Sequence, residues 1–205
     1  MKVLMINGSP HKDGTTFRAL TEVAKTLNEN GIETEIVTVG NQKVHGCMAC
    51  GTCSKTGKCA FDDIVNELID KLDNADGLIV GSPVYYAGAN GTLVSILDRM
   101  FYGRKHFAYK PAASIAVARR AGTTATLDIL NKYFLISKMP VVSSQYWNMV
   151  FGSNKTQAEE DKEGLQTMRT LGLNMAWLLK CIKAGKDSGV KTPDLEPAVR
   201  TNFVR

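Results

Sequence analysis

Four of the five cysteines in this chain of 205 residues lie in one short segment, at Cys47, Cys50, Cys53 and Cys59. Thiolates are soft donors that bind iron–sulfur clusters or tetrahedral zinc, and ferredoxin-type motifs use the same two-residue gaps. Glycines at positions 46, 51 and 57 allow the tight turns that bring such sulfurs together. Zinc is the weaker interpretation, because structural zinc usually takes two separated Cys-x2-Cys pairs. Free or redox-active thiols are the remaining alternative.

A second candidate site is the loop from Gly8 to Thr16 (GSPHKDGTT), which follows a strand pattern and leads into a helical one. The first turn of a helix leaves backbone N–H groups unpaired, and the helix dipole favours an anion there. The loop matches neither a P-loop nor a dinucleotide fingerprint. A simpler alternative is that its hydroxyl groups only cap a helix. We expect phosphate binding, with candidate residues Ser9, Pro10, Lys12, Gly14, Thr15 and Thr16.

Two further loops carry groups suited to a planar ligand. The first, from Gly81 to Gly88, has small residues that let backbone groups approach a ligand and two tyrosines that offer flat faces. Its candidate residues are Pro83, Val84, Tyr85, Tyr86 and Ala87. The second loop, from Ala118 to Thr124, supplies Arg119, Arg120 and Gly122 as candidate residues. Alternatively, the tyrosines only cover the hydrophobic core or form a subunit interface. The arginines could likewise be surface charges or form salt bridges at an interface.

These loops carry a family resemblance. N-G-S-P followed by G-T-T, and G-S-P-V-Y-Y followed by Leu97-Asp98-Arg99, resemble the NADPH-dependent FMN reductase family of flavodoxin-like proteins over roughly residues 1–151. The resemblance implies that the isoalloxazine ring is lined by Pro83 to Ala87 and that the FMN phosphate is held by Ser9, Lys12, Gly14, Thr15 and Thr16. This sequence departs from the family at two positions: His11 stands where members commonly carry Arg or Lys, and Thr15 stands where they commonly carry Asn. Arg119 or Arg120 would then face the N1–C2=O edge of the flavin or bind the 2′-phosphate of NADPH.

The cysteine segment resembles one branch of that family, the iron-sulfur flavoproteins, in which such a motif holds a [4Fe–4S] cluster. The resemblance implies an FMN-dependent oxidoreductase that takes electrons from NAD(P)H, or from a reduced carrier, and passes them to an unidentified acceptor. The alternative is an electron carrier that works with a ferredoxin-like partner and has little NAD(P)H activity. A third interpretation is a redox sensor whose cysteines form disulfides. Members of the family often place the flavin at a dimer interface, so we expect a homodimer or homotetramer.

The elements that must position these sites alternate along the chain. Strands are predicted over residues 2–7, 32–39, 77–81, 114–118 and 141–144, from short apolar runs that end in turn residues. Helices are predicted from Thr15 to about Gly31 and over 64–72, 91–101, 124–136 and 158–183. Such alternation predicts a doubly wound five-stranded parallel sheet in a three-layer α/β/α fold, with ligands at the carboxyl edge of the strands.

Length and composition set the remaining expectations. We expect one domain over residues 1–188, with a Cys-rich insertion at 45–60 and a C-terminal tail over 189–205. A net charge of +5 is spread along the chain, so no nucleic-acid partner is expected. The apolar runs are short and the cysteines are dense, which argues for a cytoplasmic protein with no membrane span.

Overall fold

The structure, a computed structural model, describes residues 1–102, 107–201 and 203. Within these ranges the strands are β1 (Lys2–Asn7), β2 (Glu33–Thr38), β3 (Gly77–Tyr85), β4 (Gly88–Ala89), β5 (Ala112–Ala118) and β6 (Met149–Phe151). The helices are α1 (Thr15–Glu29), α2 (Thr52–Thr56), α3 (Ile64–Asp73), α4 (Gly91–Phe101), α5 (Thr123–Ile136), α6 (Lys155–Glu160) and α7 (Lys162–Asp187). None of the helices in the described part of the chain is long and apolar enough to cross a bilayer.

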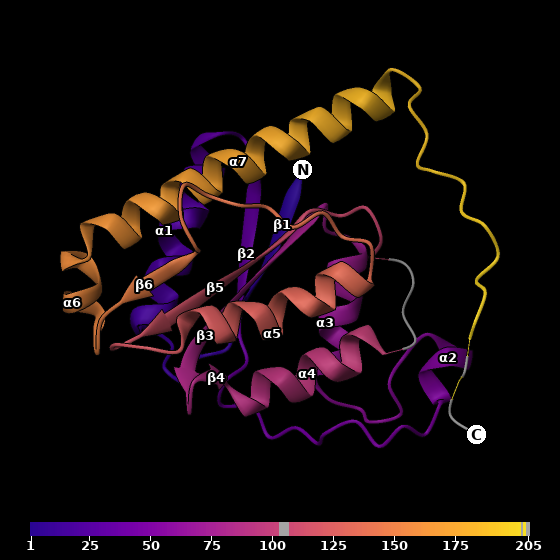
Figure 1. Ribbon diagram of the computed structural model, residues 1–205, viewed down its shortest axis with the longest axis horizontal. Helices are drawn as coiled ribbons and strands as arrows, with labels where there is room; N and C mark the ends of the chain where they lie inside the picture. The colour runs from indigo at the N-terminus through magenta and orange to yellow at the C-terminus, as the bar shows by residue number, and fades with distance from the viewer. Residues whose placement is uncertain (103–106, 202, 204–205) are drawn as a thin grey trace.

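Five strands form a parallel sheet in the order β2-β1-β3-β5-β6, and the short β4 pairs antiparallel with β3 (Figure 1). The register places Val3 of β1 between Thr34 of β2 and Gly77 of β3. Because the chain leaves β1 for β2 on one side and returns to β3 on the other, the strand order reverses beside β1. Ligands of doubly wound sheets bind at this point, outside the carboxyl ends of the strands. The predicted fold class is confirmed.

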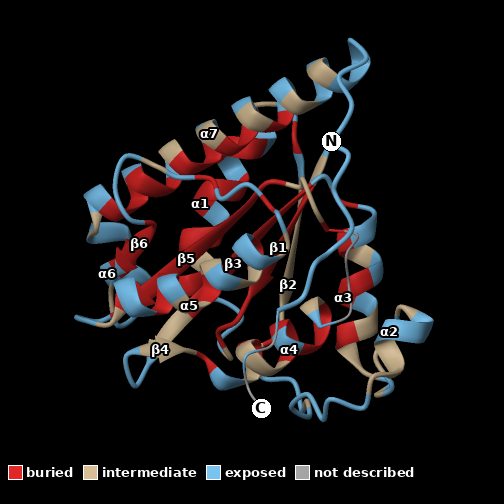
Figure 2. Cartoon of the chain, turned by 45° about the vertical axis from the view of Figure 1, so that its right-hand side comes forward, coloured by how far each residue is buried: buried red, intermediate tan, exposed pale blue. Residues whose placement is uncertain are grey.

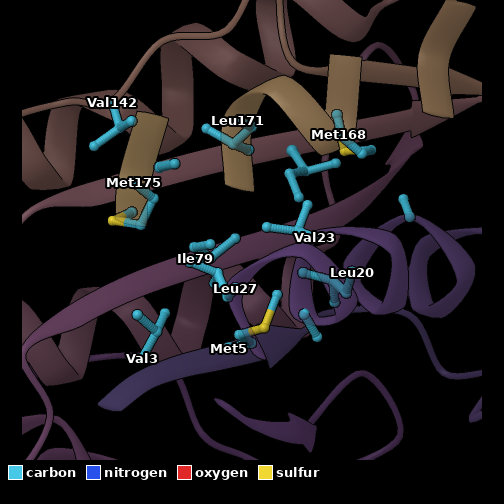
Figure 3. Close-up of a cluster of buried hydrophobic side chains, with 14 of the residues drawn as sticks. Val3, Met5, Leu20, Val23, Leu27, Ile79, Val142, Met168, Leu171 and Met175 are labelled. Atoms are coloured by element: carbon cyan, nitrogen blue, oxygen red, sulfur yellow. The ribbon is translucent and has the colours of Figure 1, made fainter. Parts of the chain in front are cut away.

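Alternate residues of each strand feed two apolar cores. Val3 and Met5 of β1 face α1 and α7, whereas Leu4 and Ile6 face α3, α4 and α5. Figure 3 shows the first core, where Leu20, Val23 and Leu27 of α1 meet α7 above the sheet. Burial is therefore greatest in the central strands, as Figure 2 shows, and the sheet lies between two helical layers. This stack holds the strand ends, and the loops that follow them, in fixed positions.

The predicted strand over 141–144 is wrong. Val141 makes one isolated bridge with Ala112, and the strand at that edge of the sheet is β6, Met149–Phe151. Val142 is buried, which explains its strand-like sequence, but a turn in which Ser144 Oγ donates to the carbonyl of Tyr146 at 2.6 Å carries the chain off the sheet. The chain rejoins β5 where the Ala116 N–H donates to the Asn148 carbonyl at 3.0 Å.

The predicted last helix, over 158–183, is instead two helices that meet at Asp161. The Asp161 carboxylate accepts hydrogen bonds from the Gly164 N–H at 2.9 Å and the Phe151 N–H at 2.7 Å. It therefore caps α7 and ties the start of that helix to β6.

The other predicted elements are present with shifted ends. β3 extends to Tyr85 and forms a hairpin with β4, and α2 is an additional short helix inside the Cys-rich segment. The expected tail has no helix or strand over 189–201 or at 203, and residues 202, 204 and 205 lie outside the described residues.

Candidate functional site

A cavity of about 780 Å³ opens at the carboxyl edge of the sheet. Its wall comes from the segments after β1 and β6 and from the carboxyl ends of β3 and β5: residues 9–16, residues 152–155, residues 83–85 and residues 117–119. The volume is within the range of small-molecule and cofactor sites. The cavity lies where the strand order reverses, which is the expected place for a ligand in this architecture.

Asn7, the last residue of β1, shapes the first loop. Its Oδ1 accepts a hydrogen bond from the Ser9 N–H at 3.1 Å, and its Nδ2 donates to Thr38 Oγ1 at 3.2 Å. Ser9 Oγ in turn accepts from the His11 N–H at 3.2 Å. The Gly8 N–H donates to the Gly81 carbonyl at 2.8 Å, so the loop after β1 is joined directly to β3.

The amino end of α1 opens into the cavity. Its N-cap is Gly14, which has no side chain to accept from the first turn, and Gly14, Thr15 and Thr16 line the cavity. The N–H groups of that turn and the threonine hydroxyls are suited to an anion such as a phosphate. An ion pair between Lys155 Nζ and Asp13 Oδ1 at 2.8 Å connects this loop to the start of α6.

The loop after β3 is a tight hairpin. Tyr86 and Ala87 both have positive φ, at 50° and 58°, as the type I′ two-residue hairpin turn requires. Non-glycine residues adopt this conformation at a cost, and such strain concentrates at functional sites. Gly122 lies against this hairpin, because a Cβ there would be 2.7 Å from the Cα of Ala87. The loops after β3 and β5 therefore support each other.

The structure divides the candidates for cofactor binding into two groups. Those that line the cavity are Ser9, Pro10, Lys12, Gly14, Thr15, Thr16, Pro83, Val84, Tyr85 and Arg119. Those beside the cavity, outside its lining, are Tyr86, Ala87, Arg120 and Gly122. The Tyr86 side chain is fully exposed at the tip of the hairpin, and Arg120 is exposed on the turn before α5.

Sequence reasoning missed one wall of the cavity, which consists of Gly152, Ser153, Asn154 and Lys155. The misplaced last strand caused this error, because these residues follow β6. The small and polar run G-S-N-K after an apolar triplet was the available signal. Asn7 was missed as well, since it reads as the last residue of a strand.

The cysteine segment lies apart from the cavity. Figure 1 shows α2 near α3 and α4, on the far side of the view from α6 and β6. Cys47, Cys50, Cys53 and Cys59 line one small hollow of about 20 Å³. Among the described residues, this hollow and the cavity share no lining residue.

The four sulfurs line one hollow without forming a coordination site. No group of three or more His, Cys, Asp or Glu side chains is arranged to hold a metal ion within residues 1–102, 107–201 and 203. The hydroxyl and the backbone N–H of Thr52 are placed to donate to the Cys50 thiolate, which lowers the pKa of Cys50. The four thiols are suitable donors for an iron–sulfur cluster, but the hollow has room for only about one water, so the exposed Cys47 and Cys50 would have to move outward to admit a cluster.

Comparisons with known proteins agree with this geometry. A family model described as NADPH-dependent FMN reductase matches residues 1–154. An iron-sulfur flavoprotein of Methanocaldococcus jannaschii is 33% identical over 192 residues, covering 89% of this chain and 100% of the relative. One from Methanosarcina thermophila is 32% identical over 193 residues, covering 91% of this chain and 100% of the relative.

Solved structures resemble the fold. A flavodoxin from the domain Archaea superposes with a TM-score of 0.61 at 13% identity, covering 88% of this chain and 99% of the other. The flavoenzyme NAD(P)H:(acceptor) oxidoreductase of Paracoccus denitrificans superposes with a TM-score of 0.63 at 18% identity, covering 87% and 97%. At these identities the likeness concerns the fold alone.

Proposed function

The chain belongs to the NADPH-dependent FMN reductase family, in its iron-sulfur flavoprotein branch, and from this premise we propose that it transfers electrons from NAD(P)H to a separate acceptor through FMN bound in the cavity. Membership of the family makes it a flavin oxidoreductase. The observation that carries the proposal is the cavity, where an uncapped helix start and a tyrosine-bearing hairpin face one space.

The residues present fit FMN. Ser9, Thr15 and Thr16 would hold the phosphate together with the first-turn N–H groups of α1. Pro83, Val84 and Tyr85 would form the wall against the ring system. When bound, FMN supplies hydride chemistry and one-electron chemistry. This chain would bind and orient the cofactor and supply positive charge, with no acid or base side chain required.

Arg119 and Arg120 are the candidates for binding the 2′-phosphate of NADPH. Both are exposed, but only Arg119 lines the cavity. A guanidinium can form a bidentate pair with a 2′-phosphate, which NADPH carries and NADH lacks. Arg119 therefore has the better position to favour NADPH.

The test is anaerobic stopped-flow mixing of the FMN-loaded protein with NADPH and with NADH. We expect bleaching of the flavin absorption at a rate that saturates with nicotinamide. Arg119→Gln should lower any preference for NADPH, while the neighbouring Arg120→Gln serves as the matched control. A protein that stays colourless after reconstitution with FMN would contradict the proposal.

The cysteine hollow favours a second candidate function, an electron carrier that exchanges single electrons with a ferredoxin-like partner. In this case Cys47, Cys50, Cys53 and Cys59 would hold a [4Fe–4S] cluster. Fast reduction by a reduced ferredoxin, with slow reduction by both nicotinamides, would favour the carrier. Flavin absorption without broad iron–sulfur absorption after anaerobic reconstitution would exclude the cluster.

We further propose a homodimer or homotetramer in the cytoplasm. Tyr146, Trp147, Leu173 and Trp177 are exposed near the edge strand β6 and on α7, and large apolar side chains of this kind mark contact surfaces. All five cysteines are unpaired, as a reducing compartment favours. Sedimentation velocity of the FMN-loaded protein tests the assembly, and a monomer at micromolar concentration would refute it.

A further inference from the structure

Arg99, near the end of α4, is a buried cation outside the cavity. It is 2% exposed, and its partners lie in the chain between β2 and α3. Nη1 donates to Asp63 Oδ2 at 2.7 Å and Nη2 donates to Asp63 Oδ1 at 2.8 Å, which is a bidentate pair. Nη1 also donates to the carbonyl of His45 at 3.1 Å. One side chain thus binds both ends of the segment that carries the cysteines.

The fourth hydrogen bond of the Arg99 guanidinium goes to a cysteine sulfur. Arg99 Nε donates to Cys59 Sγ at 3.2 Å, and the guanidinium carbon lies 4.9 Å from the centre of the Phe61 ring. Phe61 stacks on His45 with ring centres 5.1 Å apart. A guanidinium has five N–H donors, so most of its capacity is used on this segment.

Cys59 is anchored through its backbone as well as through Arg99. Its N–H donates to Asn66 Oδ1 at 2.8 Å, and its carbonyl accepts from Asn66 Nδ2 at 3.1 Å. Cys47 and Cys50, in contrast, are exposed. Asp63 also caps α3 by accepting from the Val65 N–H at 3.1 Å, so the contacts of Arg99 extend into a helix.

We propose that Arg99 is the positioning residue of the cysteine segment: it locks residues 45–63 onto α4 and directs a charged N–H donor at Cys59 Sγ. A positive charge and an N–H···S bond stabilise the more negative, reduced state of a redox group built on that sulfur, which raises its reduction potential. The consequence for the potential rests on the proposed cluster. The locking of the segment does not.

Lysine cannot replace arginine here. Its ammonium is a point charge without the planar fork that serves Asp63 and Cys59 at once. Arg99→Lys therefore keeps the charge and loses the geometry, whereas Arg99→Met removes both. Lys110→Met is a matched control, since Lys110 Nζ donates to the Leu72, Asp73 and Ala75 carbonyls at the opposite end of α3.

The first measurement is hydrogen–deuterium exchange on the full chain without added iron. In Arg99→Met we expect amides of residues 45–63 to exchange about tenfold faster, as the loss of charged hydrogen bonds predicts. Lys110→Met should loosen residues 72–76 and leave 45–63 unchanged. Unchanged exchange over 45–63 in Arg99→Met, or equal loosening there by Lys110→Met, overturns the proposal. If Arg99→Met does not fold, Arg99→Lys is judged by the same criterion.

The second measurement is an anaerobic redox titration after reconstitution with iron, sulfide and FMN. The cluster potential should shift downward in Arg99→Met and recover in part in Arg99→Lys, while the FMN potential stays constant as an internal reference. An unchanged cluster potential in Arg99→Met contradicts the proposal. If the unmodified protein takes up no iron, the cluster-bearing function fails, and the exchange measurement alone decides on Arg99.

Discussion

Gly40 shows how one residue can fix the position of the loop from Gly8 to Thr16. It follows β2, and a Cβ placed on it would lie 2.3 Å from the Gly8 carbonyl oxygen and 2.3 Å from the Ser9 carbonyl carbon. Both are backbone atoms that cannot rotate away. The loop from Gly8 to Thr16 can therefore keep its observed position only while residue 40 is glycine.

Gly40→Ala should displace this loop. We expect unfolding free energy to fall by about 1–3 kcal/mol, as for other overpacked sites, and FMN affinity to weaken by about tenfold, which corresponds to roughly 1.4 kcal/mol. Urea denaturation and quenching of FMN fluorescence measure the two effects. Gly46→Ala is the control, because a Cβ there meets nothing within 4 Å. Equal behaviour of the two variants would show that the close approach is unimportant.

Glu22 predicts a pH dependence of stability. Burial alone would raise its pKa, but hydrogen bonds from Arg169 and Arg18 lower it below the ordinary 4.5. A carboxylate with a lowered pKa stabilises the fold above its unfolded pKa, and this contribution disappears as the pH falls through the folded value.

Glu22→Gln should therefore cost about 2 kcal/mol at neutral pH, because charged hydrogen bonds between α1 and α7 are lost. The stability difference from the unmodified protein should narrow as the pH falls below 4.5, the ordinary glutamate value. Urea unfolding at a series of pH values measures it. A difference that stays constant through this range is incompatible with the assigned ion pairs.

At the scale of elements, α4 connects the cavity to the cysteine segment. It begins directly after the β3–β4 hairpin and carries Arg99 near its other end. Its start is set by Asn90, whose Oδ1 accepts from the Leu93 N–H at 3.1 Å and whose own N–H donates to Ser82 Oγ at 3.0 Å. Asn90 therefore joins the helix to the strand that leads to the cavity.

Asn90→Ala should reduce stability by about 1–2 kcal/mol through loss of the N-cap. Asn90→Ser should recover most of this, because a serine hydroxyl can accept the same bond. Guanidinium denaturation of the three proteins gives the comparison. A serine variant as unstable as the alanine variant would mean that packing at this 6% exposed site matters more than the cap.

At the scale of the whole molecule, the cavity and the cysteine hollow are separate parts of the described structure. Replacing Cys47, Cys50, Cys53 and Cys59 together by serine should therefore leave FMN affinity within about twofold of the unmodified value, a change of roughly 0.4 kcal/mol. FMN fluorescence quenching measures this, with Gly40→Ala as the variant that does lose affinity. A quadruple variant that no longer binds FMN would show that the two sites are coupled.

The sequence alone predicted the alternating elements, the parallel sheet and three of the four loops around the cavity. Apolar periodicity in α1 and the short apolar run of β1 are local signals, and a doubly wound sheet follows from their alternation. Residues whose role depends on neighbours close in sequence, such as Gly14 before α1, were accessible in the same way.

Only the tertiary structure decided what depends on partners far along the chain. β6 is recognisable because it pairs with β5, and Gly152–Lys155 enter the cavity wall through that pairing. Arg99 lies 36 positions from Asp63 and 40 from Cys59. A residue's type and spacing report its local conformation and the chemistry it offers, whereas its contacts across the fold are set by how the layers pack.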